Sequence, residues 1–372
     1  MIKLVNVITD MNIGGAGMVL HNYYKKANRT DFDHTVIVPE TSLLAPRLRE
    51  LDVNVIELPG LSPKSLDIPA IKVFSRKFRE IKPDIVHTHA SLSARIAARK
   101  QKNCAIVHTR HCAYPQAKLK TVFPGKQILG CINNYYSDII IAISPAACKD
   151  LVETGTDAKK IITMFNGVEQ LRKISDEDKA AFKKHLGIEE GDFVCAIAAR
   201  LVPEKGHIYI LEAAEKLRDL PIKFVIAGTG PCDEELRAYA ESKKLGNCIF
   251  TGFLNDVASL VNITDVQLNA SYGTEASSIS LTEGMSLGVA AVVSDFGGNP
   301  YLMTHGKDAI VVPKRNGLAM AEAIRSLYND PELLKNMGAG ALESYVTKYT
   351  TEIMAANIED VYRKAGKLAA GN

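Results

Sequence analysis

The chain has 372 residues, of which 47% are apolar and 23% are charged, a mixture typical of a globular protein rather than a disordered one. Lysine and arginine number 45 and the acidic residues 42, so the net charge of +3 argues against a general nucleic-acid binder. No apolar run approaches the roughly 18 residues that a membrane-spanning helix needs. At roughly 150 residues per domain, the length predicts two domains.

The N-terminus and the cysteines indicate a cytoplasmic protein. Residues 1–7 form a short apolar stretch that is followed too soon by Asp10 and Gly14 for a signal peptide, so we expect a first buried strand there. The seven cysteines are scattered without any Cys-x-x-Cys pair, which favours reduced thiols.

Short apolar strands alternate with helical patterns along the first half of the chain. Helices are expected at Met18–Ala27 and Ile71–Ile81. This alternation predicts a parallel sheet with helices on both faces. The expected strands are Ile2–Ile8, His34–Val38, Val53–Leu58, Asp84–His87, Ala105–Thr109 and Ile139–Ile143.

The second half repeats the pattern. Helices are expected at Ile208–Leu217, Asp233–Lys243 and Thr350–Leu368, and the boundary between the halves lies within Asn166–Glu189, where the pattern breaks. Gly288 is expected to end a helix in the left-handed conformation. The expected strands are Phe193–Ala199, Ile222–Ala227, Ile249–Gly252, Asp265–Ala270, Ala290–Ser294 and Ala309–Val312.

The loops after the strands are where chemistry is expected, because ligands of open parallel sheets bind beyond the carboxyl ends of the strands. Gly14 and Gly15 open a glycine-rich turn between the first strand and a helix. Such a turn either lets the backbone approach an anion at the helix N-terminus or is an ordinary tight turn. Its spacing does not fit Gly-x-Gly-x-x-Gly, which disfavours a dinucleotide cofactor.

Two cations follow the strand Phe193–Ala199. Arg200 and Lys205 lie on either side of a proline turn. An arginine grips phosphate oxygens with two hydrogen bonds and a lysine adds a point charge, so the pair suits a diphosphate. The alternative is a solvated loop with ordinary surface charges.

Two glutamates, Glu275 and Glu283, are the sharpest feature of the second half. Ser277 and Ser278 are candidate N-caps of a helix between them, and Glu283 is expected about two turns into that helix. The helix start offers free backbone amides to a phosphate, which places Ser278 at the diphosphate. The alternative is a solvated loop glutamate and a surface helix glutamate.

Three histidines follow strands of the first half. His111 at the mouth of a strand suits hydrogen bonding or proton transfer, while one of His87, His89 and His111 is expected to be structural. No carboxylate or cysteine lies near them at metal-ligand spacing. The string at 176–178 matches Asp-x-Asp, but the preceding Ser175 indicates a helix capping box.

Taken together, these pieces resemble a glycosyltransferase of family 4 with the GT-B fold, in which two Rossmann-like, doubly wound parallel-sheet domains face each other across a crevice. Their order and spacing along nearly the whole chain carry the resemblance. The matching pieces are Gly14-Gly15, residues 83–89, His108 to His111, Asn166 to Val168, Arg200 to Gly206, Ile226 to Gly230, Gly252 to Leu254, and the Glu-x7-Glu pair Glu275 and Glu283.

The resemblance implies site roles by position. Arg200 and Lys205 would bind the donor diphosphate, with backbone amides of Gly14 and Gly15 near the same group. Glu283 would hold the ribose hydroxyls of the nucleotide.

Three further roles follow from the same resemblance. Leu254 would contact the base through its backbone. Glu275 would bind sugar hydroxyls near the reacting carbon, and His111 would contact the donor sugar and help to align the acceptor.

The implied reaction is transfer of a sugar from a nucleotide-sugar to an acceptor hydroxyl, with retained anomeric configuration and no divalent metal or other cofactor. The leaving phosphate would take the acceptor proton in a front-face attack. The chain departs from the family in lacking a proline at Gly288 to Ala291, and in placing Tyr301 where a glutamate often follows Gly-Gly-x-Pro. The Tyr301 change leaves the donor open between a UDP-sugar, which is expected, and GDP-mannose.

By the resemblance, residues 1–168 would bind the acceptor and 169–349 the nucleotide-sugar, while the final helix at about 350–372 would pack back on the first domain. The segment 114–136 mixes lysines with apolar residues, which suits anionic lipid headgroups or else a solvated covering of the sheet. Membrane contact would point to a lipid-linked or surface-polysaccharide acceptor. Other hypotheses are a nucleotide-sugar epimerase and a non-catalytic nucleotide-sugar-binding subunit.

Overall fold

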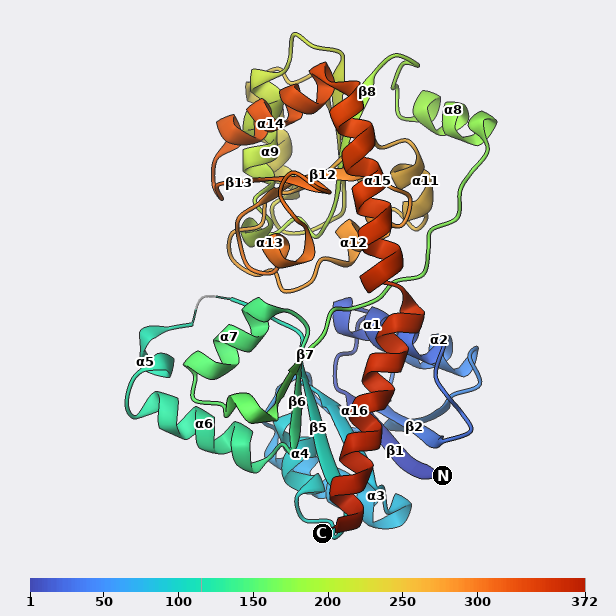
Figure 1. Cartoon of the computed structure of the whole chain (residues 1–372), viewed down its shortest axis with the longest axis vertical. Coiled ribbons are helices and arrows are strands. Elements are labelled where there is room, and N and C mark those ends of the chain that lie inside the picture. The colour runs from blue at the N-terminus through green and yellow to red at the C-terminus, as the bar shows by residue number, and fades with distance from the viewer. Residues whose placement is uncertain (115, 372) are drawn as a thin grey trace. The chain divides into compact units, whose positions relative to one another are not determined.

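The chain forms two compact units in the computed structural model, which describes residues 1–114 and 116–371 (Figure 1). Unit 1 comprises residues 1–167 and those from Thr351 onward, and unit 2 comprises Val168–Thr350. These limits differ by one residue each from the boundaries expected after residues 168 and 349. Pro115 in the segment 114–136 and Asn372 in the segment 350–372 lie outside the described residues.

Unit 1 is built on a sheet of seven parallel strands in the order β3-β2-β1-β4-β5-β6-β7. The edge strand β7 has no counterpart among the strands expected from the sequence, because its three residues are too few for a readable pattern. The strands are β1 (Ile2–Ile8), β2 (Phe32–Pro39), β3 (Asn54–Leu58), β4 (Ile85–His89), β5 (Ala105–Arg110), β6 (Ile139–Ala142) and β7 (Ile161–Thr163).

Apart from α16, the helices of unit 1 lie between successive strands. The helix expected at Met18–Ala27 instead begins at Gly15, directly after the glycine turn, and ends at Tyr24. The helices are α1 (Gly15–Tyr24), α2 (Leu44–Arg49), α3 (Ile68–Ile81), α4 (Leu92–Ala98), α5 (Lys118–Thr121), α6 (Gly125–Tyr135), α7 (Pro145–Glu153), the 3-10 turn Ala158–Lys160 and α16 (Thr351–Gly371).

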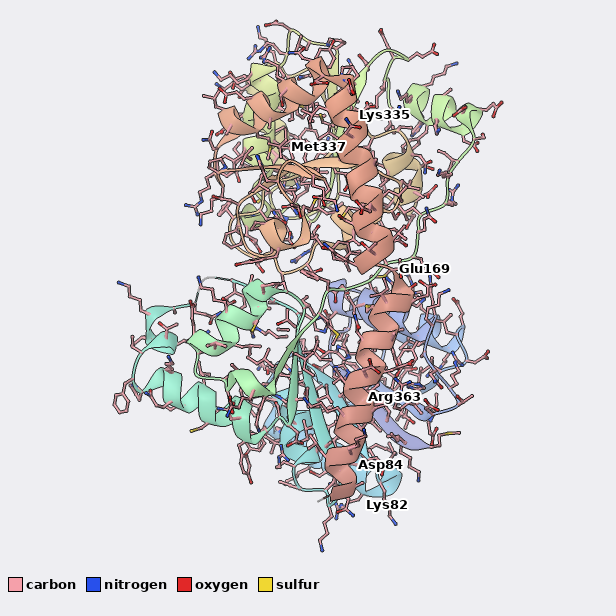
Figure 2. The ribbon with its side chains drawn as sticks, viewed as in Figure 1. Lys82, Asp84, Glu169, Lys335, Met337 and Arg363 are labelled. Carbon is pink, nitrogen blue, oxygen red and sulfur yellow. The ribbon has the colours of Figure 1, made fainter. Side chains whose placement is uncertain are left out.

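Helix α3 shows how local sequence sets these elements. Ala70, Phe74 and Phe78 recur at four-residue spacing and are buried, so one face of the helix packs on the core. The helix ends at Lys82, which adopts a left-handed conformation with φ of 53°. Figure 2 labels Lys82 and also Asp84, whose carboxylate accepts a hydrogen bond from the backbone N–H of Lys3 at 2.8 Å and so joins the starts of β4 and β1.

The final helix α16 belongs to unit 1, where it packs against α1, β4 and β5. Its buried face includes Ile358 and Tyr362. On its exposed side Arg363, labelled in Figure 2, forms ion pairs with Asp360 at 2.8 Å and with Asp31 at 3.4 Å. The last helix of the chain therefore completes the unit that contains the first strand.

Unit 2 is built on a sheet of six parallel strands in the order β10-β9-β8-β11-β12-β13. The strands are β8 (Phe193–Ala198), β9 (Ile222–Ala227), β10 (Cys248–Gly252), β11 (Val266–Asn269), β12 (Ala290–Ser294) and β13 (Ala309–Val312). The helices are α8 (Asp176–His185), the 3-10 turn Pro203–Lys205, α9 (His207–Lys216), α10 (Asp233–Ser242), α11 (Val257–Asn262), α12 (Ile279–Met285), α13 (Asn299–Leu302), α14 (Gly317–Asn329) and α15 (Pro331–Lys348).

Both faces of the unit 2 sheet are covered by helices. Successive residues of a strand point to opposite faces. Along β8, Cys195 belongs to the apolar cluster that contains residues of α9 and α14, and includes Met337 of α15 (labelled in Figure 2). Val194 belongs to a second cluster with residues of α8 and α11. The expected doubly wound, parallel-sheet fold is thus confirmed.

Each sheet reverses its direction of growth beside its first strand. The reversal lies between β1 and β4 in unit 1, and between β8 and β11 in unit 2. At such a point the loops diverge and leave room for a ligand beyond the strand ends. The glycine turn at Gly14 follows β1, Arg200 and Lys205 follow β8, and Glu275 follows β11.

The helices of the structure were compared with the requirements for crossing a membrane. Within the described ranges, no helix combines the length and the apolar character that crossing a bilayer would require.

Candidate functional site

The centre of the unit 2 site is an ion pair between Lys205 and Glu275. The Lys205 Nζ lies 2.8 Å from Glu275 Oε2, and the Glu275 side chain is only 6% exposed. The same oxygen accepts hydrogen bonds at 3.1 Å from Asn269 Nδ2 and from Ser271 Oγ. Three donors therefore hold one carboxylate oxygen, and within the described residues Oε1 has no protein donor. Glu275 is a buried and oriented group rather than a solvated loop residue.

Glycines allow the loops around Glu275 to approach each other at backbone distance. A Cβ on Gly298 would lie 1.7 Å from the carbonyl oxygen of Ala276, and one on Gly206 would lie 2.2 Å from that of Ala270. The Gly298 N–H donates to the Glu275 carbonyl oxygen at 2.9 Å. Any side chain at these two positions would push the loops apart, so their glycines set the position of the Glu275 backbone.

Asn269, Ser271 and Asn299 are site residues that the sequence reasoning missed. Asn299 Nδ2 donates to Asn269 Oδ1 at 3.3 Å and to Ser294 Oγ at 3.2 Å, and Ser294 Oγ donates to the Ser271 carbonyl at 2.6 Å. These buried groups orient Asn269 toward Glu275. A readable signal existed, since Asn269 is a polar residue at the end of an apolar strand just before the glutamate loop.

The second glutamate, Glu283, lies on helix α12. Ser278 is the N-cap of this helix, as expected, and its hydroxyl accepts from the Leu281 N–H at 3.4 Å. Because the helix begins at Ile279, Glu283 lies about one turn into it, not the two turns expected. Glu283 is half-buried rather than the surface residue of the alternative interpretation, and burial raises its pKa to about 7.

Arg200 and Leu254 complete the positions expected in unit 2. Arg200 is exposed two residues after the end of β8. Leu254 follows β10 and is half-buried against the cluster that contains Val194, so its backbone is anchored while the neighbouring Phe253 is 71% exposed. Lys205 and Glu275 are the two expected residues that the structure places in direct contact.

In unit 1 the glycine turn forms the start of α1. Gly14 is the N-cap and Gly15 the first helical residue, and no side chain in the described part of the chain caps this end. The first-turn N–H groups of a helix lack intrahelical partners and carry partial positive charge, so this end suits an anion. A Cβ on Gly14 would lie 3.4 Å from Asp10 Oδ2, which limits how large a residue could stand there.

His111 lies directly after β5 and is tied to the neighbouring strand. Its Nε2 is 2.8 Å from Nδ1 of His89, the last residue of β4. His87 is fully buried between the Tyr362 hydroxyl at 2.8 Å and the Thr109 hydroxyl at 2.7 Å, which makes it the structural histidine that the sequence led us to expect. Burial lowers the pKa of His111 to about 4 and that of His87 to about 3, so both rings are neutral at neutral pH.

Among residues 1–114 and 116–371, no group of three or more histidine, cysteine or acidic side chains is arranged to hold a metal ion. The string at 176–178 opens α8, where the Ser175 hydroxyl accepts from the Asp178 N–H at 3.1 Å. That geometry confirms the expected N-terminal cap.

Two family models match the chain, one over each half. Residues 13–170 match the model described as Glycosyltransferase Family 4, and residues 178–344 match the model described as Glycosyl transferases group 1. Together they span most of the chain.

Among similar characterised proteins, the alpha-monoglucosyldiacylglycerol synthase of Acholeplasma laidlawii is 27% identical, over 84% of this chain and 85% of its own length. An Escherichia coli enzyme described as UDP-Gal:alpha-D-GlcNAc-diphosphoundecaprenol alpha-1,3-galactosyltransferase is 26% identical, over 97% of this chain and 96% of its own. Among solved structures, Anabaena HepE in complex with UDP superposes with a TM-score of 0.84 at 17% identity, covering 98% of this chain and 100% of its own.

The raised pKa of Glu283 gives a testable pH dependence. The protonated carboxyl stabilises the folded unit, and that stabilisation is complete below about pH 4.5 and lost as the pH rises through about 7. Glu283→Gln stays neutral. We therefore expect the wild-type free energy of unfolding to fall by about 2–3 kcal/mol relative to the variant between about pH 4.5 and 8, measured by denaturant unfolding. The exposed Glu322→Gln serves as control, and parallel pH curves for wild type and Glu283→Gln would contradict the assignment.

Proposed function

The chain belongs to the family 4 glycosyltransferases, and from that membership we propose that it transfers a sugar, with retained configuration, from a UDP-sugar to a hydroxyl of a lipid-linked or polysaccharide-precursor acceptor. The observation that carries the proposal is the ion pair between the half-buried Lys205 and the buried Glu275 at the reversal point of the unit 2 sheet. A half-buried lysine beside a buried carboxylate, beyond the ends of adjacent strands, supports a cation for a phosphate next to an acceptor for sugar hydroxyls.

The leaving diphosphate is the first group that the site must stabilise. Lys205 donates one N–H to Glu275 and has two more for phosphate oxygens, while the exposed Arg200 adds a guanidinium. Negative charge grows on the phosphate oxygen as its bond to the sugar breaks, so these fixed cations act where stabilisation accelerates the reaction. They supply the positive charge that a divalent metal supplies elsewhere, and we propose that transfer needs no metal.

The sugar is the second group. We assign Glu275 Oε1 to hydroxyls near the reacting carbon, because Oε2 is already bonded to three donors. The same three bonds disperse the carboxylate's charge and make Glu275 a poor covalent nucleophile. In the proposed step the bond from the anomeric carbon to the phosphate oxygen breaks, the acceptor oxygen bonds to that carbon on the same face, and its proton passes to the leaving phosphate.

The other expected site residues are assigned to further parts of the substrates. In unit 2 we assign Glu283 to the ribose hydroxyls, the Leu254 backbone to the base and the α12 start at Ser278 to the diphosphate. In unit 1 we assign the α1 start at Gly14 and Gly15 to the diphosphate, and His111 to the sugars. Most of the assigned donor contacts thus lie in unit 2, and unit 1 would bind the acceptor.

The donor and acceptor classes rest on relatives. The Escherichia coli relative is described as using UDP-Gal and a diphosphoundecaprenol-linked sugar, and the Acholeplasma relative as a diacylglycerol glycolipid synthase. The chain's own Tyr301, 49% exposed on α13, replaces the acidic residue that family members often place there. We therefore expect a donor whose recognition does not depend on a carboxylate at that position.

Substitution at the ion pair tests the reaction. Glu275→Gln keeps hydrogen-bonding capacity but removes the charge, and we expect transfer from the UDP-sugar to fall about 100-fold or more, with a similar loss for Lys205→Ala. Lys223→Ala, which breaks the peripheral pair with Asp192, should leave transfer unchanged. Circular dichroism checks that each variant folds, because an unpaired buried Glu275 is itself costly. Near-normal turnover of a folded Glu275→Gln protein would overturn the site assignment.

Nucleotide binding tests the donor class separately. A ligand at about 100 times its dissociation constant adds about 2.7 kcal/mol to stability, which raises the melting temperature. We expect UDP to stabilise the wild type more than GDP, ADP or CMP. Preferential stabilisation by GDP would favour GDP-mannose as donor. Sugar release or inversion without any acceptor would favour the epimerase, and UDP binding without turnover would favour a non-catalytic subunit.

We further propose that α5 and α6 of unit 1 contact an anionic lipid surface. Leu119 and Phe123 are 80% and 79% exposed, and Ile128 is 56% exposed. The lysines of the same segment, Lys118, Lys120 and Lys126, are also exposed. Exposed large apolar groups beside cations fit the boundary of an anionic bilayer, where the apolar groups insert and the cations meet headgroups.

Liposome sedimentation tests this contact. We expect the wild type to sediment with vesicles rich in phosphatidylglycerol at low salt and to be released by high salt. Leu119→Ser with Phe123→Ser should reduce the bound fraction several-fold, whereas Leu318→Ser, an exposed leucine of unit 2, should not. Equal sedimentation of the double variant, or none by the wild type, would refute the lipid contact.

A further inference from the structure

A chain of buried polar side chains lies behind His111 in unit 1. His89 is 6% exposed and connects His111 to Asn6, which is fully buried on β1. The His89 Nδ1 lies 2.8 Å from His111 Nε2, and the His89 Nε2 lies 3.3 Å from Asn6 Oδ1. Tyr24 and Tyr362 bond the same asparagine from α1 and α16. This series of hydrogen bonds thus links the candidate site to α16.

The hydrogen positions in this chain follow from Asn6. Its Nδ2 donates to the Tyr24 hydroxyl at 2.9 Å, and its Oδ1 accepts from the Tyr362 hydroxyl at 3.4 Å. An amide oxygen carries no hydrogen, so the His89 Nε2 that contacts Oδ1 must be the protonated nitrogen of that ring. Burial lowers the pKa of His89 well below 6.5, so the ring is neutral and its Nδ1 carries a lone pair.

The protonated nitrogen of His111 follows from that of His89. A lone pair on His89 Nδ1 requires a hydrogen on His111 Nε2 to complete their 2.8 Å contact. The neutral His111 ring then carries its lone pair at Nδ1. Among the described residues Nδ1 of His111 has no hydrogen-bond partner, so this lone pair is available to a ligand.

We propose that His89 is a positioning residue that holds His111 in the tautomer protonated at Nε2, so that His111 Nδ1 accepts a hydrogen bond from a hydroxyl of a bound saccharide. The inference deepens the proposed function and rests on it for the identity of the ligand. It assigns His111 the role of hydrogen-bond acceptor, rather than of a proton donor. It also assigns a role to Asn6 and Tyr362, which fix the proton on His89.

The arrangement also fixes the ring in space. Register pairs Ile8 of β1 with His89 of β4, and His89 with Thr109 of β5, so the His89 backbone lies in the middle of the sheet. His111 follows β5 in a loop and has no such support of its own. A single bond from a residue in the sheet therefore limits the rotation of a residue in the loop, which reduces the entropy lost when a ligand binds.

Nitrogen NMR of protein labelled with 15N-histidine tests the tautomer without any substrate. At neutral pH we expect His111, assigned from the signals lost in His111→Gln, to show a protonated Nε2 and an unprotonated Nδ1. In His89→Leu the His111 ring should exchange between both tautomers. A His111 protonated at Nδ1 in the wild type, or a tautomer that is unchanged in folded His89→Leu, would overturn the proposal.

Kinetics test the consequence for transfer. An asparagine oxygen can stand close to where His89 Nδ1 stands, so His89→Asn should keep activity within a few-fold of wild type, while His89→Leu should lose about tenfold or more in kcat/KM. Both should keep the stabilisation by UDP. His305→Leu, which removes the acceptor of the Val311 N–H in unit 2, is the matched control. Equal activity of the leucine and asparagine variants would refute the positioning role.

The two proposals fail in different ways. A wild type without transfer activity would refute the proposed function and leave the tautomer experiment intact. Normal transfer with the wrong His111 tautomer would refute only the role of His89. If His89→Leu does not fold, the wild-type spectrum alone still decides the tautomer.

Discussion

A carboxylate that is removed from water must be compensated where it lies, and the unit 2 site is organised around that requirement. Glu275 meets it with Lys205, Asn269 and Ser271, which converge on a single carboxylate oxygen from the loop and strand ends beside it. The loops that carry these groups approach more closely than a side chain permits, which is why Gly298, after β12, is a glycine where it packs against the loop that carries Glu275. The charge of Lys205, the hydrogen bonds to Glu275 and the close approach of the loops therefore depend on one another. A substitution that removes one of them also weakens the other two.

The two units share a topology but carry different kinds of side chain at the point where the sheet reverses direction. Each presents groups beyond the strand ends where its sheet reverses direction. Unit 2 uses full charges, with Lys205 paired to Glu275. Unit 1 uses a neutral ring, because burial lowers the pKa of His111 to about 4. A charged group suits a ligand that carries charge, and a neutral acceptor suits hydroxyls, so the division of donor and acceptor proposed above matches the electrostatic character of each half.

Most of the fold could be predicted because strand patterns are local. Ile222–Ala227 was bounded correctly from its apolar run alone. Helix ends were less readable, as the early start of α1 at Gly15 shows, since a glycine N-cap gives no side-chain signal. The loop positions of Lys205 and Glu275 were predictable as well, but their contact was not, because 70 residues separate them. The bonds of Asn269 and Tyr362 depend on how distant elements pack, which no local pattern records.

Unit 1 is discontinuous in sequence, since Val168–Thr350 is inserted between its main part and α16. The first and last residues of unit 2, Val168 and Thr350, pair in an isolated parallel β-bridge. On a ribosome, the whole of unit 2 is therefore made before the helix that covers β4 and β5 emerges. Until α16 has been made, the surface of β4 and β5 that it packs against stays uncovered in unit 1, and Asn6 lacks its hydrogen bond from the Tyr362 hydroxyl. The order of synthesis thus delays completion of the hydrogen bonds around Asn6 until unit 2 has been made, and a chain that ended within unit 2 would lack the Tyr362 contact.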